Sequence, residues 1–109
     1  MSVNTDYGTY SNCMISVEHY IADDSLAIEI VNDTDGCIAR ITVCLNQKGI
    51  GEDCAFVDTN NCPWAEDFIE AYGLGTYTGE SRISGFCTYP LYRFNMEELK
   101  KYEWKTKRH

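Results

Sequence analysis

The stretch LAIEIVNDTDGCIARITVCL, residues 26–45, decides the fold class. Large aliphatic residues at 26, 28 and 30 alternate with smaller or polar ones, and a second alternating run follows from Cys37; this period of two is typical of β-strands. Between the runs, Asp35-Gly36 supplies the positive φ angles that a hairpin turn requires. In the second strand we expect Cys37, Ala39, Ile41, Val43 and Leu45 to point inward and Arg40 and Thr42 outward. The stretch therefore predicts two antiparallel strands joined by a tight turn.

The same pattern extends the sheet along the chain. Residues 13–21 alternate, residues 54–57 form a short apolar run, and residues 82–94 are a long extended run that is dense in aromatic residues. Pro90 within that run marks an edge or a bulge, because proline has no N–H to donate to a neighbouring strand. Residues 74–81 contain two glycines and are predicted to form a loop. Together these segments predict a mostly antiparallel sheet of about five strands.

A first helix is predicted at about residues 63–72. Pro63 suits the first helical position because its φ angle is preset and its missing N–H would have no partner there. We expect Asn60 and Asn61, just before it, to accept hydrogen bonds from the first turn. The apolar face of this helix is expected to consist of Trp64, Phe68, Ile69 and Tyr72.

A second helix is predicted at about residues 95–104. Asn95 can cap its first turn, and Glu98 three residues later completes a capping box. Two helices packed on one antiparallel sheet make an α+β fold. We expect residues 1–11, which are polar, to be loosely held and residues 12–109 to form a single α+β domain.

The charge of the chain is acidic and unevenly distributed. The 109 residues carry a net charge of −8, with 14 acids and 4 bases in residues 1–94 (−10) and 3 acids and 5 bases in residues 95–109 (+2). The five C-terminal bases are Lys100, Lys101, Lys105, Lys107 and Arg108. An acidic body repels phosphates, so we expect no direct binding of nucleic acid, but it suits a basic protein surface, including one that normally holds DNA. The alternative is that the charge serves solubility alone.

The location of the protein is expected to be cytoplasmic. The sequence contains no apolar run long enough to span a membrane, and its first residues lack the basic and apolar regions of a secretory signal. The six cysteines include no CxxC pair and only two histidines accompany them, so we predict no metal site, no cofactor and buried reduced thiols.

The sharpest enzyme hypothesis is a nucleophilic cysteine. Cys62 at a helix N-terminus could have a lowered pKa, with His19 as base and Asp58 or Asn60 orienting that histidine. His19, however, falls on the apolar side of its predicted strand, and the sequence signatures of cysteine proteases are absent. We therefore predict no catalytic residues.

A binding surface is favoured over an active site. The chain holds eight tyrosines and two tryptophans, and such residues are enriched at protein–protein contacts, although they also serve core packing. The candidate binding surface consists of Asp58, Asn60, Asn61, Trp64, Glu66, Asp67, Glu70, Tyr89 and Tyr92.

Three segments carry a family resemblance: SLAIEIVNDTDGCIARITVCL (25–45), AFVDTNNCPWAEDFIEAYGLG (55–75) and SGFCTYPLYRFNMEELKKY (84–102). Over roughly residues 12–102, the chain resembles an uncharacterised domain-of-unknown-function family of short acidic proteins, carried on conjugative elements and phages of gut bacteria. The resemblance supplies no catalytic residues. It implies an accessory protein of a mobile element, a class that includes anti-restriction and anti-CRISPR proteins that occupy nucleic-acid-binding surfaces; this is an argument by analogy.

Two functional hypotheses follow. The first is a non-enzymatic accessory protein that binds a host or element-encoded protein, with a nucleic-acid-binding nuclease as one candidate and inhibition of host defence as the outcome. The second is a small self-associating regulatory module, a homodimer formed through the aromatic run at residues 82–94.

Overall fold

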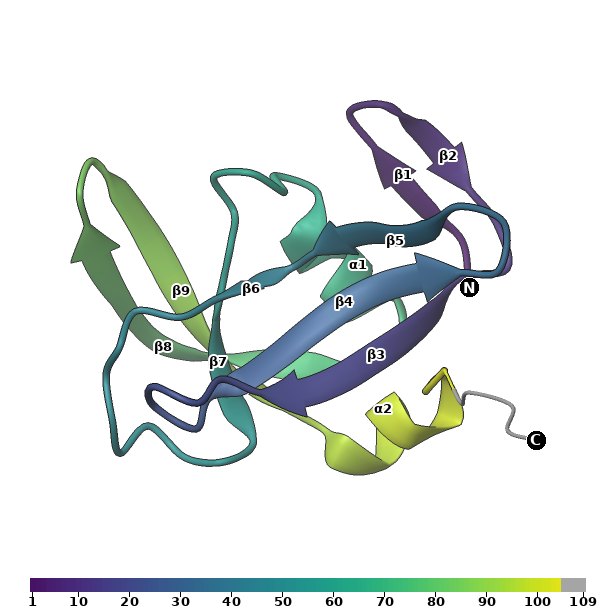
Figure 1. Ribbon diagram of the computed structural model, residues 1–109. Coiled ribbons are helices and arrows are strands. Elements are labelled where there is room, and N and C mark those ends of the chain that lie inside the picture. The colour runs from purple at the N-terminus through teal and green to yellow at the C-terminus, as the bar shows by residue number, and fades with distance from the viewer. Residues whose placement is uncertain (105–109) are drawn as a thin grey trace.

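A computed structural model describes residues 1–104, and within them the chain forms three antiparallel sheets and two short helices (Figure 1). The N-terminal hairpin pairs β1 (Val3–Thr5) with β2 (Gly8–Tyr10). The second sheet has the order β3 (Met14–His19), β4 (Leu26–Asn32), β5 (Gly36–Arg40). The third has the order β6 (Thr42–Val43), β7 (Cys54–Val57), β9 (Cys87–Phe94), β8 (Gly75–Ser84). The helices are α1 (Ala65–Ala71) and α2 (Met96–Lys101).

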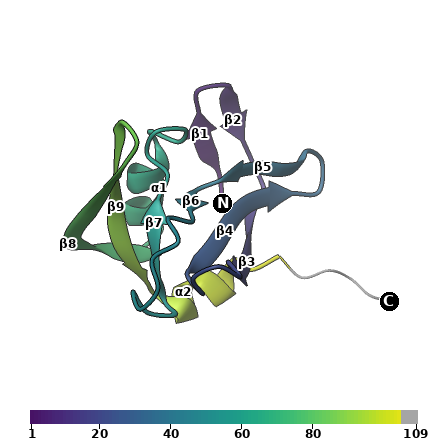
Figure 2. The same ribbon diagram turned by 60° about the vertical axis from the view of Figure 1, so that its left-hand side comes forward.

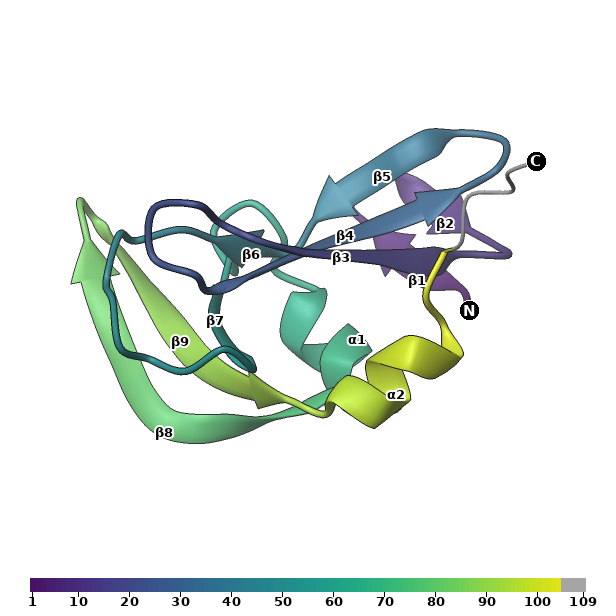
Figure 3. The same ribbon diagram turned by 60° about the horizontal axis from the view of Figure 1, so that its bottom comes forward.

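One main core joins these layers. It combines buried residues from all three sheets and both helices, among them Val3, Ile28, Val57, Ile69 and Leu99. The two larger sheets stand side by side beneath the N-terminal hairpin in Figure 2, and both helices lie on the same side of the β3–β4 pair in Figure 3. No helix among residues 1–104 is both long and apolar enough to cross a membrane.

The α+β class is confirmed, but the single five-stranded sheet is wrong, because the chain changes sheets at Ile41. Its N–H donates to Ile28 O of the second sheet at 3.0 Å, and its C=O accepts from Asp58 N, at the end of the third sheet, at 2.8 Å. Ile41 is fully buried. The run that the sequence predicts as one strand is therefore two, β5 and β6, which belong to different sheets.

The predicted inward and outward positions in this run are wrong at Cys37 and Thr42. The pairing of β4 with β5 shifts by one residue, so that Ala39 faces Ile30 but Cys37 faces the next residue, Val31. Ile30 and Val31 are neighbours on β4, so their side chains point to opposite faces of the sheet. Their partners Ala39 and Cys37 therefore also lie on opposite faces, and Cys37 is exposed.

Thr42 is buried because its hydroxyl accepts the Ile28 N–H in place of a backbone carbonyl. It is 2% exposed, and its Oγ1 accepts the Ile28 N–H at 3.0 Å. The Tyr20 hydroxyl donates to Thr42 O at 3.1 Å. Both backbone groups of Ile28 are thus bonded to the segment that crosses between the sheets.

Residues 1–11, which the sequence suggests are loosely held, build β1 and β2 in the structure. Val3 is 3% exposed and belongs to the main core. The N-terminal ammonium of Met1 donates to Cys13 O at 3.0 Å, and Cys13 N donates back to Met1 O at 2.7 Å. These contacts join the start of the hairpin to the residue before β3, and the hairpin lies near β5 (Figure 1).

The predicted loop at residues 74–81 and the single extended run at residues 82–94 are both wrong. Residues 75–94 form one β8–β9 hairpin that turns at Gly85, whose φ of +63° suits glycine, and projects from the body (Figure 1). Of the two alternatives predicted for Pro90, an edge or a bulge, the structure has a bulge: the register shifts between Tyr77 and Ser81, and Ser81 pairs with Pro90. β9 is flanked by β7 and β8, so β8 forms the outer edge.

α1 is shorter than the predicted helix, and the predicted asparagine caps are wrong. Its cap position is Trp64, which makes no side-chain capping bond. The asparagines instead belong to a turn that the Asp58 carboxylate organises, because Asp58 accepts from both the backbone and the side chain of Asn61.

α2 keeps half of its predicted capping box. Asn95 Oδ1 accepts from Glu97 N and Glu98 N at 3.0 and 3.2 Å, whereas the Glu98 carboxylate accepts from Lys101 Nζ. The helix ends early because residues 102–104 bond to Ile15 on the outer edge of β3. The predicted basic residues Lys105, Lys107 and Arg108 lie outside the described residues.

Replacing Thr42 with valine tests the junction between the sheets. Thr42→Val keeps the shape but leaves the buried Ile28 N–H without an acceptor, so we expect the free energy of unfolding to fall by about 1–3 kcal/mol. Denaturant titration measures the loss, with Thr88→Val, at an exposed strand position, as the control expected to stay within about 0.5 kcal/mol. Equal stability of Thr42→Val and wild type contradicts this role.

Candidate functional site

A groove of about 390 Å³ lies between the N-terminal hairpin, β5 and the turn before α1. We call it the β5 groove. It is lined by Thr5, Asp6, Tyr7 and Tyr10 from the hairpin, by Ile38, Ala39 and Arg40 from β5, and by Asp58, Asn61, Cys62 and Trp64 from the turn. Its lining combines apolar, aromatic and acidic side chains, the mixture found in binding sites.

Asp58 is held rigidly in the wall of this groove. Its N–H donates to Ile41 O at 2.8 Å, and its carboxylate accepts from Asn61 N at 3.2 Å and Asn61 Nδ2 at 2.9 Å. The residue is only 9% exposed. Among residues 1–104, no lysine, arginine or histidine forms a salt bridge with it. Neutral donors therefore orient the carboxylate without cancelling its charge.

Cys62 forms part of the groove and lies between two negative charges. It is 4% exposed, and its Sγ lies 3.5 Å from Arg40 O. Burial first, and then the charges of Asp58 and Asp6, raise the pKa of the Cys62 thiol to about 11. Both carboxylates line the same groove as the thiol.

These observations argue against the cysteine-nucleophile hypothesis. A nucleophile needs a lowered thiol pKa, and that of Cys62 is raised. The proposed base, His19, is exposed rather than on an apolar face, and its Nε2 lies 3.1 Å from Glu52 O. The Cys62 thiol instead faces the backbone of Arg40.

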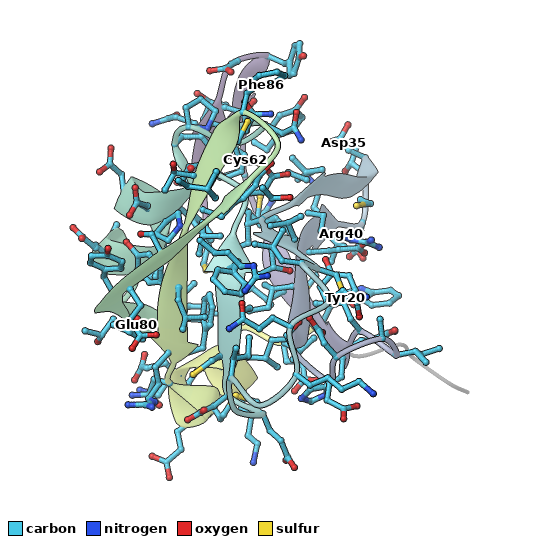
Figure 4. All side chains as sticks on the ribbon, turned by 90° about the vertical axis from the view of Figure 1, so that its left-hand side faces the viewer. Tyr20, Asp35, Arg40, Cys62, Glu80 and Phe86 are labelled. Carbon is cyan, nitrogen blue, oxygen red and sulfur yellow. The ribbon has the colours of Figure 1, made fainter. Side chains whose placement is uncertain are left out.

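Arg40 brings little free positive charge to the groove. Its guanidinium bonds to Glu29 Oε2, with Nε at 3.0 Å and Nη2 at 2.5 Å, and this contact raises its pKa. The guanidinium also lies 5.8 Å from the centre of the Tyr20 ring, on the same side of the molecule (Figure 4). Because Glu29 balances Arg40, the carboxylates of Asp6 and Asp58 leave the groove negative.

Three aromatic side chains, Tyr7, Tyr10 and Trp64, line the groove, and Tyr7 and Trp64 do so in different ways. Tyr7 is 92% exposed at the hairpin turn. Trp64 is half-buried and packs edge-on against Phe68, with ring centroids 6.3 Å apart. Such rings offer flat surfaces on which an apolar or cationic group can lie.

The structure brings three of the nine predicted surface residues, Asp58, Asn61 and Trp64, into the groove. Asn60 is exposed in the same turn. Tyr89, on β9, is half-buried. A hydrogen bond with Cys87 and burial raise the pKa of the Tyr89 hydroxyl, and the negative charge of Asp58 adds a smaller contribution. These residues lie around the turn that Asp58 organises.

The α1 candidates form a surface next to the groove. Asp67 and Glu70 are exposed, and Asp67 lines a neighbouring hollow that also includes Trp64. Glu66 is half-buried, and its Oε2 accepts from the Tyr92 hydroxyl at 2.7 Å. Tyr92 is 1% exposed, so it does not reach the surface; burial and then Glu66 raise its pKa. It belongs to the main core and lies on β9, an inner strand flanked by β7 and β8.

Sequence reasoning missed the hairpin side of the groove and the β5 edge. The sequence Asp6-Tyr7-Gly8 is typical of a turn and could have indicated the hairpin. In the structure Gly8 has a φ of +135° and pairs with Thr5. No comparable pattern identifies residues 38–40, because their place at a sheet edge depends on the switch of sheets at Ile41. Within residues 1–104, no three His, Cys, Asp or Glu side chains are placed to hold a metal ion.

The chain belongs to the family described as a domain of unknown function (DUF4313), whose model matches residues 14–107. This confirms the expected membership of an uncharacterised family. No curated protein and no solved structure matches the chain.

Thiol alkylation tests the environment of Cys62. At pH 8, a thiol with a pKa of about 11 has about a hundredfold less thiolate than one at the ordinary 9.0, and burial slows its reaction further. We expect iodoacetamide to label exposed Cys37 first and Cys62 only on unfolding, as measured by mass spectrometry. Labelling of native Cys62 as fast as free cysteine contradicts this and reopens the nucleophile hypothesis.

Proposed function

We propose that this member of the DUF4313 family is a non-enzymatic protein that acts by binding another protein through the β5 groove. The observation that carries the proposal is the pair of carboxylates, Asp6 and Asp58, without a cationic partner among residues 1–104, beside the aromatic rings of Tyr7 and Trp64. Aromatic anchors with a polar surround are typical of protein–protein contacts.

The proposal extends to the partner. An acidic binding surface suits a protein with a basic site, and residues 1–94 carry a net charge of −10. The exposed carboxylates of Asp67 and Glu70 enlarge the acidic surface next to the groove. We propose a host or element-encoded nucleic-acid-binding protein, such as a defence nuclease, as the partner. The chain then competes with nucleic acid in the cytoplasm as an anti-defence inhibitor encoded by a mobile element, with no nucleic acid or cofactor bound directly.

An affinity capture with matched variants tests the site. Wild-type protein, a groove variant (Asp6→Lys with Tyr7→Ala) and a hairpin control (Glu80→Lys with Phe86→Ala) are immobilised and exposed to nuclease-treated host lysate. Each double variant replaces one exposed acidic residue with lysine and one exposed aromatic residue with alanine. The two variants therefore have the same net charge and each lose one aromatic ring from the surface. We expect wild type and the hairpin control to retain the same DNA-binding protein and the groove variant to lose it, with release at high salt.

The outcomes separate the parts of the proposal. Equal capture by all three baits contradicts the groove as the binding site. A specific partner that does not bind nucleic acid supports protein binding but contradicts the anti-defence role. A captured nuclease whose activity the wild-type protein lowers, and the groove variant does not, supports both.

The β8–β9 hairpin favours the second candidate function, a self-associating module. Ile83 is 72% exposed, and Phe86, at the hairpin tip in Figure 4, is fully exposed. The predicted dimer strand at residues 82–94 cannot act as a whole, because β9 is already paired on both sides; β8 is the available edge of the described sheet.

Light scattering after size-exclusion chromatography tests self-association. A β8-mediated dimer is expected to show twice the monomer mass and to dissociate with Ile83→Lys, because the charge interrupts an apolar edge. Thr88→Lys, on the paired strand opposite Ile83, is the control that leaves the dimer intact. A monomer at all concentrations excludes this second function.

A further inference from the structure

We infer that the β5 groove receives an extended segment of the partner that carries lysine or arginine, laid along the outer edge of β5. The inference rests on the proposed function and names the chemistry that the same site recognises. Three features of the groove support it: a strand edge, carboxylates without a cationic partner among residues 1–104, and aromatic rings on the lining.

The strand edge comes from the place of β5 in its sheet. Among the described strands, β5 is the last of the order β3–β4–β5, and residues 38–40 line the groove along it. Arg40 O, on this edge, has the Cys62 thiol at 3.5 Å as its contact on the groove side, and a thiol is a weak donor. An extended chain can add to such an edge through backbone hydrogen bonds.

Other edges suit an added strand less well. Residues 102–104 already occupy the outer edge of β3 through two hydrogen bonds with Ile15. On β8, the Arg82 side chain already donates to Gln47. Both β8 and β5 contain a bulge, so what sets the β5 edge apart is the groove beside it. The β5 edge is the one that coincides with an acidic groove.

The carboxylates select a cationic side chain. Asp58 is nearly buried, and among residues 1–104 its carboxylate accepts hydrogen bonds only from the neutral amides of Asn61, while Asp6 is exposed at the hairpin turn. A nearly buried carboxylate without an opposite charge gains from a cation brought into hydrogen-bond reach. An acidic segment is repelled at the same place, and an apolar one leaves both charges unpaired.

The aromatic rings complete the recognition. Tyr7 and Trp64 lie on the lining of the same groove as the two carboxylates. The face of such a ring attracts an ammonium or guanidinium group, and the stem of lysine or arginine packs on its apolar surface. A segment that alternates basic and aliphatic residues can therefore place the basic ones over the rings and the backbone along β5.

A peptide titration tests the inference. The probe is a blocked synthetic hexapeptide of three Lys-Val repeats, and the matched control is three Glu-Val repeats. In a Trp104→Phe background, Trp64 is the one remaining tryptophan, so its fluorescence reports on the groove. We expect saturable binding of the Lys-Val peptide that weakens with salt, and no binding of the Glu-Val peptide.

Variants and hydrogen exchange locate the peptide. Asp6→Asn and Tyr7→Ala are each expected to weaken binding about fivefold to tenfold, corresponding to about 1–1.4 kcal/mol. Glu80→Gln removes one exposed carboxylate elsewhere and is expected to change the affinity less than twofold. Bound peptide is expected to slow amide exchange within residues 38–40, which a purely electrostatic association leaves unchanged.

Each contrary result has a defined meaning. Equal binding of both peptides, equal weakening by Glu80→Gln and Asp6→Asn, or unchanged exchange at residues 38–40 overturns the inference. If the Lys-Val peptide does not bind but the groove variant still loses the captured protein, this inference fails and the proposed function stands. If both fail, the groove is not a binding site.

Discussion

The fold depends on the hydrogen bonds around Ile41. This residue bonds to Ile28 in one sheet and to Asp58 at the end of the other, and Thr42 beside it takes the remaining N–H of Ile28. Buried backbone groups need partners, so the chain can cross between sheets here only because all of these groups are paired. The same crossing frees β5 on its outer side and places Asp58 opposite it. The junction therefore holds the sheets together and creates the groove.

The groove shows how a site can follow from incomplete charge pairing. Arg40 is balanced by Glu29, and Asn61 fixes Asp58 with neutral donors, so the acidic charge at this place is organised but not cancelled. The charge also reaches Cys62, whose thiol it helps to keep protonated. The raised pKa of Cys62 argues against the nucleophile hypothesis for this thiol, and the proposed recognition of an opposite charge rests on the carboxylates beside it.

Local patterns predicted much of the fold but less of the site. The alternation in β3 and β4, the hairpin turn between them and β5, the cap at Asn95 and the bulge near Pro90 all follow from chemistry within a few residues. Of the two positive φ angles predicted for that turn, Gly36 has one (+75°) and Asp35 does not. Three of the predicted surface residues line the groove, because the turn that contains them is recognisable in the sequence. The opposite wall was missed because it comes from segments distant in the sequence, and Tyr92 was misplaced because no local pattern shows that β9 is an inner strand.

The sequence by itself determined the α+β class, the strand periodicity, the acidic balance and the family, since composition and short-range spacing carry these properties. The tertiary structure alone decided that one run splits at Ile41 into two strands, that residues 75–94 turn back on themselves, and that the N-terminal hairpin meets β5. The physical reason is that strand partners and sheet edges are set by long-range hydrogen bonds and shared burial. The same alternating pattern is compatible with different partner strands and different sheets, so the pattern alone does not specify them.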